Sequence, residues 1–159
     1  MRGLSADVRR LLPKRTLAAT RARDGTWLAG TRDALHLVGP EIEEVTLPWE
    51  SVESATWNSD EDRLRITEVG EYGEPRRTFA FALDDPGSLL ALVRERVTAS
   101  VVLQRRAEGG LTVVARRPPR GGEITWAYEL DPGVDPGDPA VRRAAASALR
   151  AAQDEVGMI

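Results

Sequence analysis

The feature that most constrains this fold is a series of short segments in which apolar and polar residues alternate, separated by turn signals. Such alternation is typical of half-buried β-strands, because successive side chains of a strand point to opposite faces. Residues 15–22 and 26–31 flank Asp24-Gly25, a dipeptide that favours a tight hairpin turn. Five further segments show the same pattern, at residues 34–38, 43–48, 52–58, 63–68 and 77–83. The sequence therefore predicts seven short antiparallel strands.

A helix is predicted directly after the last of these segments. Asp85-Pro86 is typical of a helix start, and the apolar residues that follow it recur at helical spacing: Leu89, Leu90, Val93 and Val97. We expect a helix over residues 86–98 whose apolar stripe covers the open end of a small barrel. A flat sheet of seven strands would leave two unpaired edges, and closure removes them. The expected fold class is α+β, with a seven-stranded antiparallel barrel capped by a helix.

Residues 99–159 predict a smaller unit, a three-stranded antiparallel meander followed by a C-terminal helix. Its strand-like segments, at 100–103, 111–117 and 123–130, are separated by Gly109-Gly110 and by the turn sequence of residues 118–122. Asp138-Pro139 then favours the start of a helix with a narrow, alanine-rich stripe. A unit of this size has a thin core of its own. We therefore expect it to dock on the barrel formed by residues 15–98.

The first 14 residues predict a short amphipathic helix between a candidate N-cap at Ser5 and a stop at Pro13. Its apolar residues recur at helical spacing: Leu4, Val8, Leu11 and Leu12. This apolar face is small, which favours a helix lying on the domain over a membrane anchor. The segment lacks the apolar core of a secretion signal, and no window approaches the roughly 18 apolar residues of a membrane-spanning helix. We therefore expect a cytoplasmic protein.

Four short motifs carry a resemblance to a known family. They are Asp24-Gly25-Thr26-Trp27-Leu28, Thr31-Arg32-Asp33-Ala34-Leu35, Leu47-Pro48-Trp49 and Leu83-Asp84-Asp85-Pro86. With the order of seven strands and a helix, they make residues 15–98 resemble the pleckstrin-homology-like (PH-like) domains of bacteria, in particular those of small actinobacterial proteins. PH-like folds in general bind lipid headgroups, peptides or partner proteins. The resemblance thus implies a binding scaffold and fixes no particular chemistry.

The side chains on which most enzymes depend are missing or isolated. The chain has no cysteine and a single histidine, His36, which excludes a cysteine nucleophile, thiolate metal sites and multi-histidine metal centres. His36 lies within a strand-like segment, and we interpret it as structural or solvent-facing. Motifs for a nucleophilic serine, a phosphate-binding loop and dinucleotide binding do not occur in the sequence. We expect no catalytic residue, no metal site and no cofactor.

Charge is unevenly distributed along the chain, although the net charge is only −3. Residues 1–23 carry seven basic residues against one acid, and residues 41–71 carry ten acids against two arginines. Residues 94–120 carry seven arginines against two acids. Blocks of opposite sign can pair between molecules. Together with the missing catalytic groups, this layout favours a non-enzymatic interaction module that binds a protein partner or a second copy of itself.

An alternative function is the binding of nucleic acid or another anionic ligand through arginines in residues 105–120. Five arginines are the candidates: Arg105, Arg106, Arg116, Arg117 and Arg120. A sequence pI of about 5.3 and the lack of aromatic residues between these arginines count against nucleic acid. Binding of lipid headgroups through Arg21 and Arg23, beside the first hairpin turn, is a further alternative. We expect neither nucleic acid nor a membrane to be the main partner.

Overall fold

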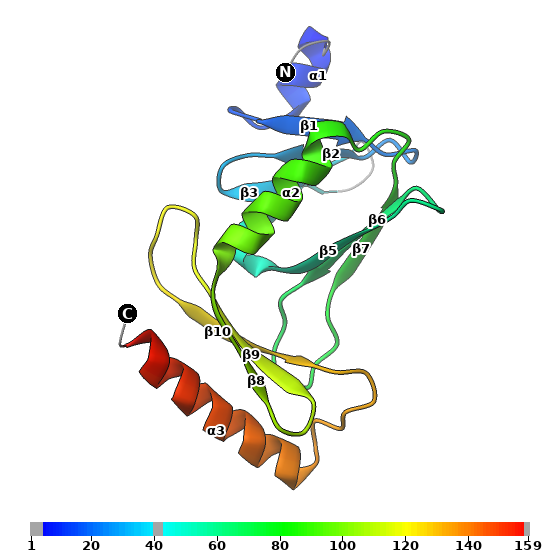
Figure 1. The fold of residues 1–159 in the computed structure, drawn as a ribbon. Coiled ribbons are helices and arrows are strands. Elements are labelled where there is room, and N and C mark those ends of the chain that lie inside the picture. The colour runs from blue at the N-terminus through cyan, green and yellow to red at the C-terminus, as the bar shows by residue number, and fades with distance from the viewer. Residues whose placement is uncertain (1–4, 40–42, 158–159) are drawn as a thin grey trace.

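The computed structural model describes residues 5–39 and 43–157 and has a mixed α+β fold with antiparallel sheets (Figure 1). The first sheet has the strand order β1-β2-β3-β4, the second β5-β6-β7 and the third β10-β9-β8. Consecutive strands are therefore neighbours within each sheet, as expected for strands joined by tight turns. The first sheet lies at one end of the molecule, and the third sheet lies at the other (Figure 1).

The strands of the first two sheets lie within the seven predicted segments. The first sheet consists of β1 (Ala18–Arg21), β2 (Trp27–Gly30), β3 (Ala34–Val38) and β4 (Val45–Pro48). A short 3-10 helix, η1 (Trp49–Ser51), leads into the second sheet, which consists of β5 (Val52–Asn58), β6 (Arg63–Glu68) and β7 (Thr78–Ala82). Gly25, in the β1–β2 turn, has a φ of +93°, which glycine adopts without steric strain. The Asp-Gly hairpin signal is thus confirmed.

The prediction of a closed seven-stranded barrel was wrong, because β1–β4 and β5–β7 form two separate sheets. The chain leaves the first sheet at Pro48, which has no N–H for a further ladder bond. The next residue, Trp49, is fully buried, and its indole N–H donates to the Thr31 carbonyl at 2.9 Å. This anchor holds the chain in η1, so that β5 starts a new sheet. At the opposite corner, a backbone hydrogen bond of 2.9 Å from Arg23 N–H to the Ala82 carbonyl joins the ends of the two sheets.

The helix α2 (Gly87–Ser100) covers the core that the first two sheets share. Leu89 and Val93 of the predicted stripe are fully buried there, and the other two residues of the stripe are partly buried against the same core. Gly30 permits the close approach of α2 to β2, because a Cβ at this position would lie 2.5 Å from Leu92 Cδ2. The prediction of a covering helix is confirmed, with a start one residue later and an end two residues later than expected.

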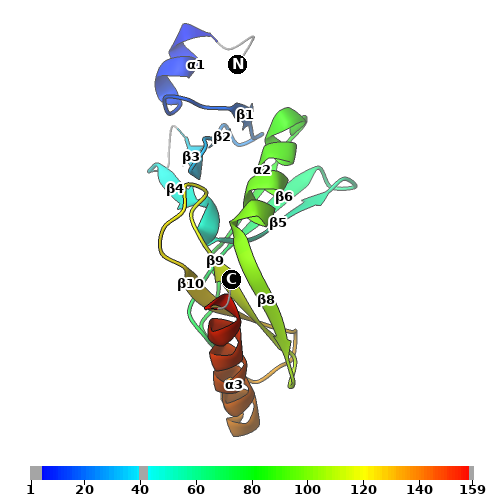
Figure 2. The same ribbon diagram turned by 60° about the vertical axis from the view of Figure 1, so that its left-hand side comes forward.

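The predicted meander and C-terminal helix are also confirmed. The third sheet consists of β8 (Val101–Ala107), β9 (Leu111–Arg116) and β10 (Thr125–Leu130), and α3 (Pro139–Val156) packs on one face of it. The Asp138 carboxylate caps α3 by accepting from Ala140 N–H at 2.9 Å. Figure 2 shows α3 beside the third sheet, at the end of the molecule far from β1. Since α2 ends at Ser100 and β8 begins at Val101, no loop separates α2 from the third sheet.

The N-terminal segment contains the helix α1 (Ala6–Leu11), which the Ser5 side chain caps by accepting from Val8 N–H at 3.3 Å. Leu12 is buried, but Leu11 is 59% exposed, so α1 adds little to the core. Residues 1–4 of the predicted helix, and Glu41 of the acidic block, lie outside the described residues. In the part of the chain that the structure describes, no helix is long and apolar enough to cross a membrane.

Candidate functional site

The loop of residues 117–124, between β9 and β10, reaches from the third sheet to the first (Figure 1; Figure 2). Arg120 in this loop donates from Nε to Asp33 Oδ1, in the β2–β3 turn, at 2.8 Å. The hydrogen bond favours the charged form of both groups, so it lowers the pKa of Asp33 and raises the pKa of Arg120. Two different cavities are lined by residues of this loop, since Pro118, Pro119 and Arg120 contribute to both.

The first cavity, here called the junction cavity, has a volume of about 500 Å³ and lies between the residues that precede β1, the first sheet and the loop. Four prolines contribute to its lining: Pro13, Pro48, Pro118 and Pro119. Its charged lining consists of four basic and two acidic residues: Lys14, Arg15, Arg32, Arg120, Asp33 and Glu50. Positive charge predominates in this cavity because the basic residues outnumber the acidic ones, and the ion pair between Arg120 and Asp33 neutralises one of each.

Backbone strain and an unpaired oxygen distinguish the wall of the junction cavity. Arg15 has a φ of +64°, a conformation that is unfavourable for a residue with a Cβ and that is found at functional sites. Oε2 of Glu50 is buried without a hydrogen-bond partner among the described residues. His36 is held between two hydroxyl groups, with Nε2 3.2 Å from Thr31 Oγ1 and Nδ1 3.4 Å from Thr46 Oγ1. The wall of the cavity therefore contains a residue with a strained backbone, a buried carboxylate oxygen without a partner among the described residues and an imidazole ring held in place.

The second cavity, here called the arginine pocket, has a volume of about 520 Å³ and lies where α2 meets β8. Three arginines line it: Arg96 from α2, and Arg117 and Arg120 from the loop. Of these, only Arg120 pairs with a carboxylate among the described residues. The Nε atom of Arg96 is buried and has no hydrogen-bond partner among them. The pocket thus concentrates positive charge and unused donors.

The five predicted anion-binding arginines do not form one patch. Arg106 lies close to the β8–β9 turn, whereas Arg116 lies opposite Val101 at the other end of the ladder. The structure brings Arg117 and Arg120 together in the arginine pocket and leaves Arg106 and its neighbour Arg105 apart from them. Two of the five candidates thus lie together, and the other three are not among the residues that line this pocket.

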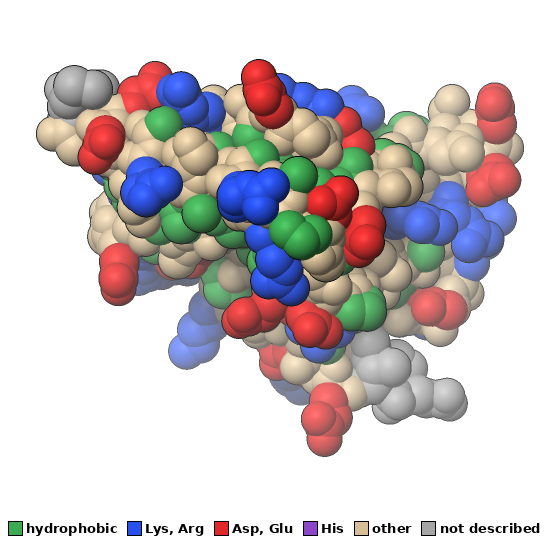
Figure 3. All heavy atoms as spheres, turned by 90° about the horizontal axis from the view of Figure 1, so that it is seen from below, with side chains coloured by type: hydrophobic (Ala, Val, Ile, Leu, Met, Phe, Trp, Pro, Cys, Tyr) green, Lys and Arg blue, Asp and Glu red, His purple; other side chains and the backbone are tan. Residues whose placement is uncertain are grey.

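Acidic side chains neutralise Arg105 and Arg106, the two arginines that lie apart from the arginine pocket. Arg105 Nη1 lies 3.3 Å from Glu155 Oε2 of α3, and Arg106 donates two hydrogen bonds to the Asp131 carboxylate. The hydrogen bond between Arg106 and Asp131 raises the pKa of Arg106 and lowers the pKa of Asp131. In the face seen in Figure 3, side chains of both signs are interspersed with apolar ones. These two arginines therefore offer little free charge to a polyanion.

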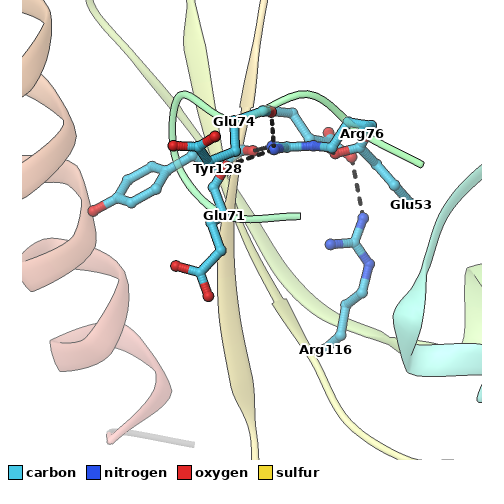
Figure 4. Close-up of polar contacts among 7 residues, drawn as sticks. Glu53, Glu71, Glu74, Arg76, Arg116 and Tyr128 are labelled. Atoms are coloured by element: carbon cyan, nitrogen blue, oxygen red, sulfur yellow. Dashed lines mark hydrogen bonds and ion pairs between the residues drawn. The ribbon is translucent and has the colours of Figure 1, made fainter. Parts of the chain in front are cut away.

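Arg116 is a buried structural residue rather than a surface ligand. Its side chain, labelled in Figure 4, belongs to a residue that is only 3% exposed. Its Nη2 donates to Glu129 Oε1 of β10 at 3.1 Å. Its Nε and Nη1 are buried without a partner among the described residues. A side chain this deeply buried has no access to a large anion.

Arg76, in the loop between β6 and β7, joins the second sheet to the third (Figure 4). Its Nε donates to Glu53 Oε1 of β5 at 3.1 Å, and its Nη2 donates to the Tyr128 carbonyl of β10 at 2.5 Å. Its Nη1 donates to the Glu71 and Glu74 carbonyls of its own loop at 2.7 and 3.1 Å. One guanidinium group thus fixes the position of the third sheet, and with it the loop that lines both cavities.

Aromatic contacts reinforce this connection. The Tyr72 hydroxyl donates to the Pro136 carbonyl at 2.9 Å, and its ring meets the Tyr128 ring edge-on, with 5.2 Å between centroids. The Tyr128 hydroxyl donates to the Ala145 carbonyl of α3 at 3.2 Å, and burial raises the pKa of Tyr128. Residues 99–159 therefore contact the preceding sheets through specific polar and aromatic groups.

The predicted lipid-headgroup residues Arg21 and Arg23 line neither cavity. Arg23 donates from Nε to Asp84 Oδ1 at 2.7 Å and from Nη2 to Asp62 Oδ2 at 3.3 Å. These contacts, chiefly the hydrogen bond to Asp84, raise the pKa of Arg23. Arg21 is exposed on β1. Because two carboxylates surround Arg23, this site is less positive than the sequence predicted.

Sequence reasoning missed most of the residues that form the two cavities. The missed residues are Lys14, Arg15, Arg32 and Arg96, together with Arg76, which positions the loop. Pro118-Pro119 was a usable signal, because a rigid turn restricts where the next arginine can point. Arg76 had no recognisable signal, since the two groups through which it joins the sheets, the Glu53 carboxylate and the Tyr128 carbonyl, are 23 and 52 residues away in the chain.

The comparisons with known protein families and with curated proteins indicate no function for this chain. No protein-family model matches the chain, and no curated protein matches it. Within residues 5–39 and 43–157, no three histidine, aspartate or glutamate side chains gather as a metal site. The functional conclusion therefore depends on the two cavities and on the contacts that hold them.

Proposed function

We propose that the protein is a non-enzymatic interaction module that binds an acidic segment of a protein partner in the junction cavity. The observation that carries this proposal is the lining of that cavity by four prolines and four basic residues. Proline restricts the backbone, so a wall of prolines loses little freedom when a ligand binds. Basic side chains attract acidic groups and set the register of a charged partner. A peptide that carries both acidic and small apolar residues matches both features.

The PH-like character of residues 15–98 is part of the same proposal. A four-stranded sheet, a three-stranded sheet and a helix that covers their shared core support it. In this proposal residues 99–159 complete the binding surface, because Pro118, Pro119 and Arg120 come from them. We also propose a cytoplasmic location, which suits a chain without cysteine.

Self-association is a second candidate, because the molecule carries an acidic segment of its own. Asp60 and Glu61 are exposed in the turn between β5 and β6. This turn of one molecule has the charge that the junction cavity of another would accept. Nucleic-acid binding has less support, because the predicted arginines are dispersed and most of them are paired with carboxylates.

Fluorescence anisotropy with a labelled acidic peptide that contains apolar residues tests the proposal. The double variant Arg15→Glu/Arg32→Glu should weaken binding by at least about tenfold, because two attractive charges become repulsive. The matched control is Arg63→Glu/Arg65→Glu, which makes the same charge change on exposed residues of β6 and should leave the affinity unchanged. Equal weakening in both variants would show non-specific attraction and contradict the proposal. Sedimentation equilibrium of the same proteins tests self-association.

A further inference from the structure

The arginine pocket adjoins the proposed peptide site, with which it shares Pro118, Pro119 and Arg120, and its remaining lining residues are different. Among the described residues that line it are three arginines and no acid. The rest of the lining is small or apolar: Ala99, Val101, Val102, Pro118, Pro119 and Gly121. Its volume of about 520 Å³ lies within the range of roughly 300–1,000 Å³ that is typical of small-molecule sites. Size and charge therefore suit a small organic anion.

The guanidinium groups of this pocket retain donors that no described protein group uses. Nε of Arg96 is buried without a partner. Arg120 donates to Asp33 from Nε, which leaves its two Nη groups available. Arg117 is exposed, and its backbone N–H rather than its side chain bonds to α2, at the Ser100 carbonyl. A ligand with several acceptor oxygens would bond to the free Nη groups of Arg120 and to the exposed side chain of Arg117. Arg96, whose Nε is shielded from solvent, adds positive charge to the pocket.

The C-terminal end of α2 borders the arginine pocket, but its backbone carbonyls repel an anion less than unpaired carbonyls would. The last carbonyls of a helix carry partial negative charge. Here the Val97 carbonyl accepts from Ser100 Oγ at 2.6 Å, and the Ser100 carbonyl accepts from Arg117 N–H at 2.9 Å. The Thr98 carbonyl accepts from Val101 N–H. These dipoles are therefore engaged by protein donors.

We propose that the arginine pocket binds the phosphate group of a small phosphorylated molecule. A phosphate monoester carries close to two negative charges near neutral pH and has three acceptor oxygens, so it can bond to several guanidinium groups at once. A carboxylate has two oxygens, which a single arginine can satisfy, and it would leave the other arginines unpaired. No aromatic residue is among the described residues of the pocket, so nucleic-acid bases would find no stacking surface there. The apolar wall suits the organic part of the ligand.

Isothermal titration calorimetry of the full chain tests this site, with inorganic phosphate and a sugar monophosphate as probes and with ionic strength held constant by chloride. The wild-type protein should bind both probes saturably, and the monophosphate more tightly. Arg117→Gln should weaken binding by at least about tenfold, because it removes one charge-assisted contact. Its side chain has no carboxylate partner among the described residues, so the variant should fold normally. Arg96→Gln should act in the same direction.

Arg105→Gln is the matched control, because it removes the same charge from an exposed position on β8 that does not line the pocket. Its phosphate affinity should equal that of the wild type. The proposal is overturned if the wild type shows no saturable binding, or if Arg105→Gln and Arg117→Gln lose affinity equally. Tighter binding of a phosphoserine peptide than of the sugar monophosphate would also overturn it in favour of a phosphorylated protein. Because Arg117 does not line the junction cavity, Arg117→Gln should keep acidic-peptide binding, which separates this test from that of the proposed function.

Discussion

Replacing Arg76 by alanine should destabilise the protein strongly, because this side chain connects the second and third sheets. The variant Arg76→Ala loses the contact with Glu53 and the hydrogen bonds to the carbonyls of the loop and of Tyr128. It also leaves the Glu53 carboxylate in a largely buried position without its counter-charge. The expected decrease in the free energy of unfolding is about 3 kcal/mol.

The size of this stability loss follows from how deeply the ion pair between Arg76 and Glu53 is buried. Removing one partner of a buried ion pair costs about 3–5 kcal/mol, since the other charge is left unpaired. The side chains of Arg76 and Glu53 are 17% and 15% exposed, so water still reaches both groups and the lower end of this range applies. For a protein of this size, about 3 kcal/mol corresponds to a decrease in Tm of roughly 6–12 °C. Arg76→Lys should fall between wild type and alanine, because an ammonium group cannot span the same acceptors.

Urea denaturation followed by circular dichroism and by tryptophan fluorescence measures this effect. Arg77→Ala is the matched control, because Arg77 is 54% exposed and its contact of 2.6 Å with Glu68 lies at the surface. That variant should lose no more than about 1 kcal/mol. Trp126 lies in the third sheet and contributes to the fluorescence change together with the other three tryptophans, which lie in the first two sheets and η1. Equal effects of the two substitutions, or a loss below about 1 kcal/mol for Arg76→Ala, would refute the reasoning.

Three further predictions concern the core, the junction cavity and the loop. Leu89→Ala should lower the free energy of unfolding by about 2–5 kcal/mol in chemical denaturation, because Leu89 is fully buried between α2 and the two sheets; a smaller loss would mean that the site repacks. Arg15→Gly should raise stability in thermal denaturation by about 1 kcal/mol, because glycine adopts a φ of +64° without strain, and a decrease would contradict this. The lowered pKa of Asp33 means that its contact with Arg120 is complete above the ordinary value of 3.8 and is lost as pH falls through the lower pKa of the folded state. NMR titration should show the pKa of Asp33 moving toward 3.8 in Arg120→Ala, and an unchanged pKa would exclude Arg120 as the cause.

The order of strands and helices was predictable because its signals are local. Alternation and turn residues such as Asp24-Gly25 placed all seven strands of the first two sheets within the expected segments. The division into two sheets was not predicted, because it depends on the contact between Trp49 and Thr31, which are 18 residues apart. The four apolar residues of α2 predicted its covering role correctly, since an apolar stripe on a helix is buried against the core and the preceding strands supply that core.

The candidate site was less predictable, because it depends on long-range placement. An antiparallel hairpin with its turn at Gly109-Gly110 necessarily puts Arg106 and Arg116 at opposite ends, so the register alone argued against a single patch. Arg117 and Arg120 were identified, but their companion Arg96 comes from a helix 21 residues earlier than Arg117. No local pattern shows which face of a helix will meet a loop that returns from another sheet.

The direct passage from α2 into β8 has a mechanical consequence. Each residue contributes two soft backbone torsions, so the direction of the third sheet relative to α2 is set by very few rotations around Ser100 and Val101. With Arg76 and Arg120 holding it on either side, the C-terminal portion should tumble together with the rest of the protein and show one rotational correlation time. Inserting a few glycine and serine residues after Ser100 would replace this stiff connection by a tether and let the two portions reorient separately.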